Sequence, residues 1–134
     1  MSYPINYPTP QRSNYQEFYG GGTTRDWVKP QGASFVWFTL IGAGGGGYFD
    51  DGLSNAQGGG SGVVTNFMGP AFLIPDRLKI NVGRGGAPAT SITPTDTTVY
   101  YQEKTSGGYL LLTAASGTNG GSSGTGGLGG TAMT

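Results

Sequence analysis

A phosphate-binding loop is the first chemistry that the sequence suggests, because residues 42–47 fit the spacing G-x-G-x-x-G directly after an apolar run. A dinucleotide site also needs a helix after this loop, so that the amides at the helix N-terminus face the pyrophosphate. Residues 48–62 contain Gly52 and a run of three glycines, without the apolar period of a helix. No Lys-Ser or Lys-Thr pair follows the loop, as a P-loop requires. The sequence therefore predicts no nucleotide site and no cofactor.

The sequence also indicates neither a metal site nor a catalytic site. Asp50, Asp51 and Asn55 carry the oxygen atoms that Ca²⁺ prefers, but their spacing matches no calcium loop and favours a solvated loop tip. The chain has no His and no Cys, which excludes thiol catalysis, disulfide bonds, thiolate zinc sites and imidazole bases. Its serines lack a neighbouring group that would activate them. We therefore predict a protein that is not an enzyme and holds no metal.

Two aromatic residues, Tyr48 and Phe49, follow the first glycine run. Aromatic rings at such a position either fill the core or form a contact surface for a sugar or a protein. The sequence leaves both alternatives open, so we take Tyr48 and Phe49 as candidate contact residues.

The composition indicates one folded domain with many loops. The 134 residues include 28 Gly and 8 Pro, yet aromatic residues make up 12% and charged residues only 10%, the opposite of a disordered chain. Basic and acidic residues cancel, which argues against nucleic acid as a partner and favours association between copies. With no apolar run of about 18 residues and no basic-then-apolar start, we expect neither a membrane span nor a signal peptide.

Residues 1–22 form the first expected unit, an extended arm rich in proline and tyrosine. Tyr-Pro pairs at 3–4 and 7–8, with Pro10 after them, hold the backbone extended. The arm is either a frayed terminus or a segment that docks on a neighbouring subunit, and we favour docking. The expected contact residues are its large apolar side chains: Tyr3, Ile5, Tyr7, Tyr15, Phe18 and Tyr19.

Residues 23–134 form the second expected unit, a glycine-rich β-domain. Short apolar and β-branched runs predict a strand ending at Trp27–Val28 and further strands at 35–41, 63–67, 78–82, 97–102 and 109–114. The unbroken run at 35–41 predicts a central strand buried on both faces. We expect an all-β antiparallel sandwich, jelly-roll-like, with its core formed by Phe35 or Trp37 together with Phe38, Leu40, Ile80, Val82, Leu110 and Leu112.

The glycine runs allow two physical roles. They are either flexible loops or extended polyglycine strands, which pack closely because no Cβ atom keeps them apart. The runs return regularly, at 44–47, 58–60, 85–86, 120–121, 126–127 and 129–130. An isolated polyglycine helix has no internal hydrogen bonds, so the second role requires neighbouring segments.

The order of the landmarks resembles a known type of domain. A Trp-x-Lys-Pro turn at 27–30 leads into the apolar run at 35–41 and the glycine run at 42–47. Similar patterns follow at 73–75, 78–87 and 110–117. This order, over about residues 23–130, resembles the glycine-rich domains of bacteriophage and other viral structural proteins, which occur in tail fibres, fibre-tip adhesins and minor virion proteins. The arm lies outside the resemblance, and no functional residue carries over from it.

These observations lead to a functional hypothesis that the resemblance supplies and the residues allow. We expect a non-enzymatic virion protein, a minor capsid, decoration or fibre-base component held by its arm, with capsid or tail subunits and further copies of itself as partners. The alternative is a tail-fibre adhesin that presents glycine-rich loops to a receptor on the host surface. A glycine-rich cell-surface protein is disfavoured by the expected lack of a signal peptide.

Overall fold

The strands lie close to their predicted positions. The computed structural model describes residues 14–48, 57–87, 92–101, 108–121 and 126–131. In these ranges one short 3-10 turn, η2 (Ala71–Leu73), accompanies six strands: β1 (Thr23–Val28), β2 (Phe35–Ile41), β3 (Val64–Pro70), β4 (Arg77–Val82), β5 (Thr97–Tyr101) and β6 (Tyr109–Ala114). No helix of the described ranges is long and apolar enough to cross a membrane.

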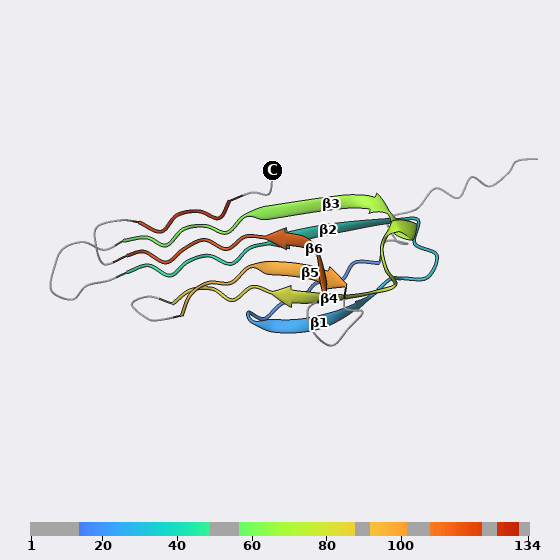
Figure 1. Cartoon of the computed structure of the whole chain (residues 1–134), viewed down its shortest axis with the longest axis horizontal. Helices are drawn as coiled ribbons and strands as arrows, with labels where there is room; N and C mark the ends of the chain where they lie inside the picture. The colour runs from blue at the N-terminus through green and yellow to red at the C-terminus, as the bar shows by residue number, and fades with distance from the viewer. Residues whose placement is uncertain (1–13, 49–56, 88–91, 102–107, 122–125, 132–134) are drawn as a thin grey trace, which may run out of the picture.

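The strands form two antiparallel sheets that pack as two layers (Figure 1). The larger sheet has the order β1-β4-β5-β6, and the smaller one consists of β2 and β3. Every strand pair is antiparallel, with Phe35 opposite Pro70 and Ile41 opposite Val64 in the smaller sheet. The prediction of an all-β antiparallel sandwich is confirmed.

The prediction that residues 35–41 are buried on both faces is wrong. Along β2, burial alternates at every residue: Val36, Phe38 and Leu40 are buried, whereas the residues between them face outward. The physical reason is that the smaller sheet is an outer layer. It packs against β5 and β6 on one side only, so one face of the apolar strand stays uncovered.

The core lies between the two sheets. Trp27 of β1 and Phe38 of β2 meet edge to face there, with ring centroids 5.2 Å apart and an angle of 67° between the rings. Of the predicted core, Phe38, Leu40 and Ile80 are buried, and Val82 and Leu112 are partly buried against them. The prediction that Phe35 or Trp37 is buried is wrong, because both lie on the outward face of β2. Prediction missed the remaining buried apolar residues, Trp27, Val36, Ala71, Leu78, Val99 and Ala114.

Leu110 corrects a further prediction, because it lies on the surface rather than in the core. Val99 of β5 pairs with Leu112, but the next residue, Tyr100, pairs with Leu110. This β-bulge skips Leu111. Because side chains alternate between faces, one extra residue turns all positions beyond it to the other face.

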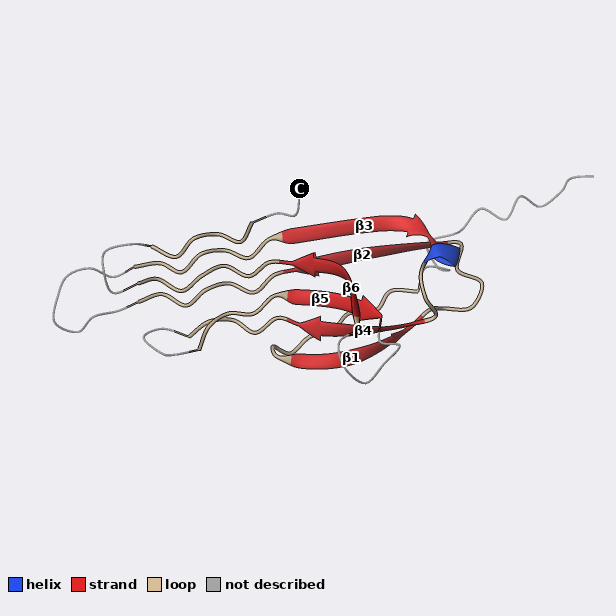
Figure 2. Cartoon of the chain, viewed as in Figure 1, coloured by secondary structure: helices blue, strands red, loops and turns tan. Residues whose placement is uncertain are grey.

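Six extended segments, some before and some after the strands in the chain, run side by side away from the sheets (Figures 1 and 2). We call this array the glycine bundle. Its segments are residues 42–48, 57–63, 83–87, 92–96, 115–121 and 126–130.

Candidate interaction surfaces

The glycine bundle is held by backbone hydrogen bonds that recur every third residue. Gly42, Gly45 and Tyr48 donate from segment 42–48 to the carbonyls of Val63, Gly60 and Gln57, each over 2.8 Å. A period of three is that of the polyproline II helix, which has no hydrogen bonds within itself and leaves its donors free for neighbours. The segments therefore behave as polyglycine helices bonded to one another.

The same rule joins the other segments into a network. Segment 115–121 donates from Gly117 to Ala43 (2.9 Å) and from Gly120 to Gly46 (3.0 Å). Segment 126–130 donates from its residues 127 and 130 to residues 58 and 61, and residue 86 donates to residue 44, each over 2.8–2.9 Å. Segment 42–48 thus contacts three neighbours, as expected of a bundle rather than of a flat sheet.

Glycine is required because the backbones approach too closely for a side chain. A Cβ atom built on Gly45 lies 1.9 Å from the Thr118 carbonyl oxygen, and one on Gly60 lies 1.9 Å from that of Leu128. Real Cβ contacts essentially never fall below 3.0 Å. Of the two roles that the sequence left open, the structure has packed polyglycine strands. The sequence signal is glycine at every third position, as at 117–120 and 127–130.

Two side chains fasten the bundle. Asn119 accepts a hydrogen bond from the Gly46 amide (2.7 Å) and donates one to the Ile92 carbonyl (2.8 Å), so it joins three segments. Where the sheets pass into the bundle, the buried Thr97 hydroxyl donates to Ile41 (2.7 Å) and accepts from the Gly83 amide (3.0 Å). Sequence reasoning missed both residues, because neither an Asn beside glycines nor a Thr at the start of a strand has a distinctive spacing.

The Trp-x-Lys-Pro turn has a structural role. Trp27 is in the core, and the Lys29 ammonium group donates to the carbonyls of Ala71 (3.2 Å) and Ile74 (2.9 Å) at the two sides of η2. It also forms an ion pair with Asp76 at 2.7 Å. The turn that follows ends at Gly32, whose φ of 76° lies in the left-handed region.

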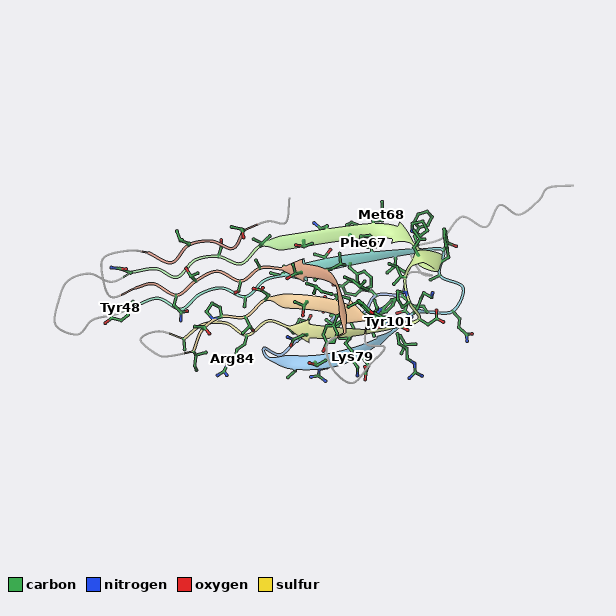
Figure 3. The ribbon with its side chains drawn as sticks, viewed as in Figure 1. Tyr48, Phe67, Met68, Lys79, Arg84 and Tyr101 are labelled. Carbon is green, nitrogen blue, oxygen red and sulfur yellow. The ribbon has the colours of Figure 1, made fainter. Side chains whose placement is uncertain are left out.

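The outer face of the smaller sheet is a first candidate interaction surface. The side chains that alternate with the buried ones face solvent there: Phe35, Trp37, Ile41, Val64 and Met68. Figure 3 shows Met68 on the outside of β3, and Phe67 on the inner side, where it packs against the core. Exposed large apolar groups gathered on one face mark a contact site more often than scattered ones do.

Part of the predicted arm is a second candidate surface. Tyr15 and Tyr19 are 80% and 71% exposed, and both hydroxyls donate to the Glu17 carboxylate. The hydrogen bond to Glu17 raises the pKa of Tyr15 above its usual value. Phe18 differs, because it packs partly buried against the domain's own core. The other predicted contact residues, Tyr3, Ile5 and Tyr7, lie outside the described residues.

Tyr48 lies at the far end of the bundle from the sheets (Figure 3). Its backbone pairs with Gln57 in an isolated antiparallel bridge, and its side chain is half-buried. The sequence left open whether Tyr48 fills the core or forms a contact surface. Tyr48 does not belong to the core between the sheets, which lies at the other end of the molecule. Phe49, Asp50, Asp51 and Asn55 lie outside the described residues.

Metal-binding side chains do not cluster in the described ranges, and a surface hollow is lined by Glu17, Arg25 and Asp26 together with Phe18 and Tyr19. No three His, Cys, Asp or Glu side chains meet in those ranges to hold a metal ion. A cavity of about 160 Å³ lies between the sheets, but its lining is apolar and includes Phe67, Leu78 and Val99.

Comparison with known protein families matches residues 18–134 to a glycine-rich domain. No curated protein and no solved structure gives a significant match.

Proposed function

The chain belongs to the glycine-rich domain family, and from this membership and the geometry of the bundle we propose that it is a non-enzymatic structural subunit of a virion. Its position there is that of a minor capsid, decoration or fibre-base component. The arm at residues 1–22 docks on neighbouring capsid or tail subunits. The resemblance of the sequence to viral glycine-rich domains supports the virion as its location.

The observation that carries this proposal is the packing of the glycine bundle. Its segments bond to one another through the backbone, at distances where a Cβ atom would lie 1.9–2.2 Å from a carbonyl oxygen. Such contacts leave little freedom for the fluctuations that flexible loops undergo. A stiff projection of backbone suits a part that holds a fixed shape within an assembly better than one that binds and releases a substrate.

Docking by the arm is supported by what the arm exposes. Tyr15 and Tyr19 lie uncovered beside the domain. Each large apolar side chain that a partner covers completely adds roughly 1.5–3 kcal/mol to binding. Repeated in every copy, such contacts hold a subunit that carries little charge.

Quantitative mass spectrometry of purified particles tests the proposal. The wild-type chain is compared with a full-length variant in which Tyr3, Ile5 and Tyr7 are Ser, and with a control variant carrying Thr9→Ser in the same arm. We expect wild type and control at many copies per particle and the triple variant to be lost from particles while its domain stays folded. Incorporation of the triple variant at the wild-type level overturns docking by the arm, and absence of the wild-type chain from particles overturns the virion role.

A receptor-binding adhesin is the second candidate, favoured by the position of Tyr48. The far end of the bundle brings Tyr48 and Gln57 together and places Gly120 beside them. An adhesin at a fibre tip is present in a few copies per particle, whereas a shell component is present in many. The same copy-number measurement therefore separates the two candidates.

A further inference from the structure

The outer face of the β2–β3 sheet carries five exposed large apolar side chains. Its exposed fractions are 68% for Phe35, 71% for Trp37, 65% for Ile41, 55% for Val64 and 70% for Met68. These side chains follow from the strand period, since every second residue of β2 and β3 points outward. Folding of one chain leaves all five in contact with water.

The face has the area of a protein interface. Scaled from the roughly 150–250 Å² that an aromatic side chain buries, the five exposed groups present roughly 600 Å² of apolar surface. That is at the upper limit of what monomeric proteins expose, and a stable dimer buries about 800 Å² on each partner. Thr39, Asn66 and Pro70, which lie between the five in the strand register, supply the remaining area.

Two polar side chains at the centre of the face bond to each other. Thr39 and Asn66 lie opposite one another in the register, and the Thr39 hydroxyl donates to the side-chain oxygen Oδ1 of Asn66 over 2.8 Å. Burying a polar group is costly when it loses its hydrogen bonds to water and gains none. Here the central pair keeps its bond when the face is covered. Neither strand contains a charged residue, so a covering partner desolvates no ion.

We propose that this face binds the same face of a second copy, in a two-fold symmetric dimer. The four rows of the register are Phe35/Pro70, Trp37/Met68, Thr39/Asn66 and Ile41/Val64. The two-fold axis lies in the plane of the interface, at right angles to the strands, between the second and third rows. It sets the bulky row Trp37/Met68 of one copy against the small row Thr39/Asn66 of the other. The end rows then oppose each other, apolar against apolar.

A second copy fits better than a partner of different chemistry. The face offers no charge with which a charged protein or a nucleic acid would pair. It is self-complementary in size along its length, as a symmetric interface must be. Sheets that pack face to face in this way interdigitate their side chains like the layers of a sandwich. The proposal concerns this face alone and does not depend on a role in a virion.

Sedimentation equilibrium of the full-length chain over a concentration series tests the dimer, against a monomer mass of 13.7 kDa. The test variants are Trp37→Lys and Met68→Lys. The control is Leu110→Lys, which places the same charge at an equally apolar and exposed position on β6. Because all three side chains face solvent, circular dichroism should show unchanged folding. We expect wild type and Leu110→Lys to be dimers, and the dissociation constant to rise at least about 30-fold in both test variants, as for a central aromatic anchor.

Two results, for the wild-type chain and for Trp37→Lys, overturn the proposal, and a third comes from an arm variant. One is a wild-type chain that stays monomeric at about 100 μM, a concentration well above the dissociation constant of a standard-size interface. The partner of the face would then be a different protein. The other is a Trp37→Lys variant that dimerises like wild type. A full-length variant with Tyr3, Ile5 and Tyr7 changed to Ser separates the occupants, since it dimerises normally under this proposal, whereas loss of the dimer would make the arm the occupant and refute face-to-face binding.

Discussion

Replacing single glycines of the glycine bundle by alanine tests whether its segments are closely packed or are flexible loops. The test variant is Gly45→Ala, whose new Cβ meets the Thr118 carbonyl oxygen at 1.9 Å. The matched control is Gly58→Ala, where a Cβ meets nothing within 4 Å, in a neighbouring segment of the same bundle. Neither position has a φ in the left-handed region, so backbone strain does not confuse the comparison.

The expected loss follows from the distances. To bring the Cβ–oxygen contact from 1.9 Å to 3.0 Å, segment 115–121 must move away from segment 42–48 by about 1.1 Å. That displacement breaks the hydrogen bonds from Gly117 to Ala43 and from Gly120 to Gly46, now 2.9 and 3.0 Å long. Two lost bonds at about 0.5–1.5 kcal/mol each, with residual overpacking, reduce the free energy of unfolding by about 2–4 kcal/mol.

Urea and thermal denaturation measure this loss. At about 4 °C per kcal/mol for a chain of this size, Gly45→Ala should melt roughly 8–16 °C below wild type. Gly58→Ala should match wild type or gain about 0.4–1 kcal/mol, because alanine restricts the unfolded chain. Equal stabilities for the two variants would refute close packing of the bundle.

Three further predictions concern the core and two side chains that hydrogen-bond to backbone groups of other segments, and each is measured by urea denaturation. Leu78→Ala should cost about 2–5 kcal/mol because Leu78 is 2% exposed, whereas Leu110→Ala should cost less than about 1 kcal/mol; equal losses would contradict the described core. Asn119→Ala should cost about 1–3 kcal/mol, because the Gly46 amide loses its acceptor and the Ile92 carbonyl loses one donor while keeping its bond from the Ala87 amide; an unchanged midpoint would contradict the role of Asn119 in linking the segments. Lys29→Ala should cost about 1–3 kcal/mol, since the Ile74 carbonyl loses its Lys29 donor and the Ala71 carbonyl is left with the Ile74 amide. Lys79→Ala, which breaks a surface ion pair with Asp26, should cost at most about 1 kcal/mol; the reverse order would contradict the role of Lys29.

The strands were predictable from the sequence because short apolar runs end at glycine and proline. The run at 109–114 coincides with β6, and the run at 78–82 lies within β4 and contains Ile80, whose predicted burial is confirmed. The burial of β2 was not predictable from its own residues. An unbroken apolar strand has the same sequence whether both faces are covered or one face awaits a partner, and only the number of packed layers decides between them.

The glycine bundle was predictable in kind but not in detail. Composition and the return of glycine runs allowed packed strands as one alternative. Which segments bond to each other depends on contacts across wide sequence separations, as between Gly46 and Asn119, and no local pattern records them. The contact residues of the arm stay a prediction. The exposure of Tyr15 and Tyr19 supports it, whereas Phe18 packs on its own domain.

Hydrogen exchange of the backbone amides, measured residue by residue by NMR, tests most directly whether the glycine segments form a fixed bundle. The Gly45 and Gly60 amides donate bonds of 2.8 Å to the Gly60 and Thr118 carbonyls. We predict that both exchange about 10³-fold or more slowly than in an unstructured peptide, as expected of amides that open only with the fold. Exchange of both at the rate of an unstructured peptide would contradict the account, because glycine runs that behave so are loops.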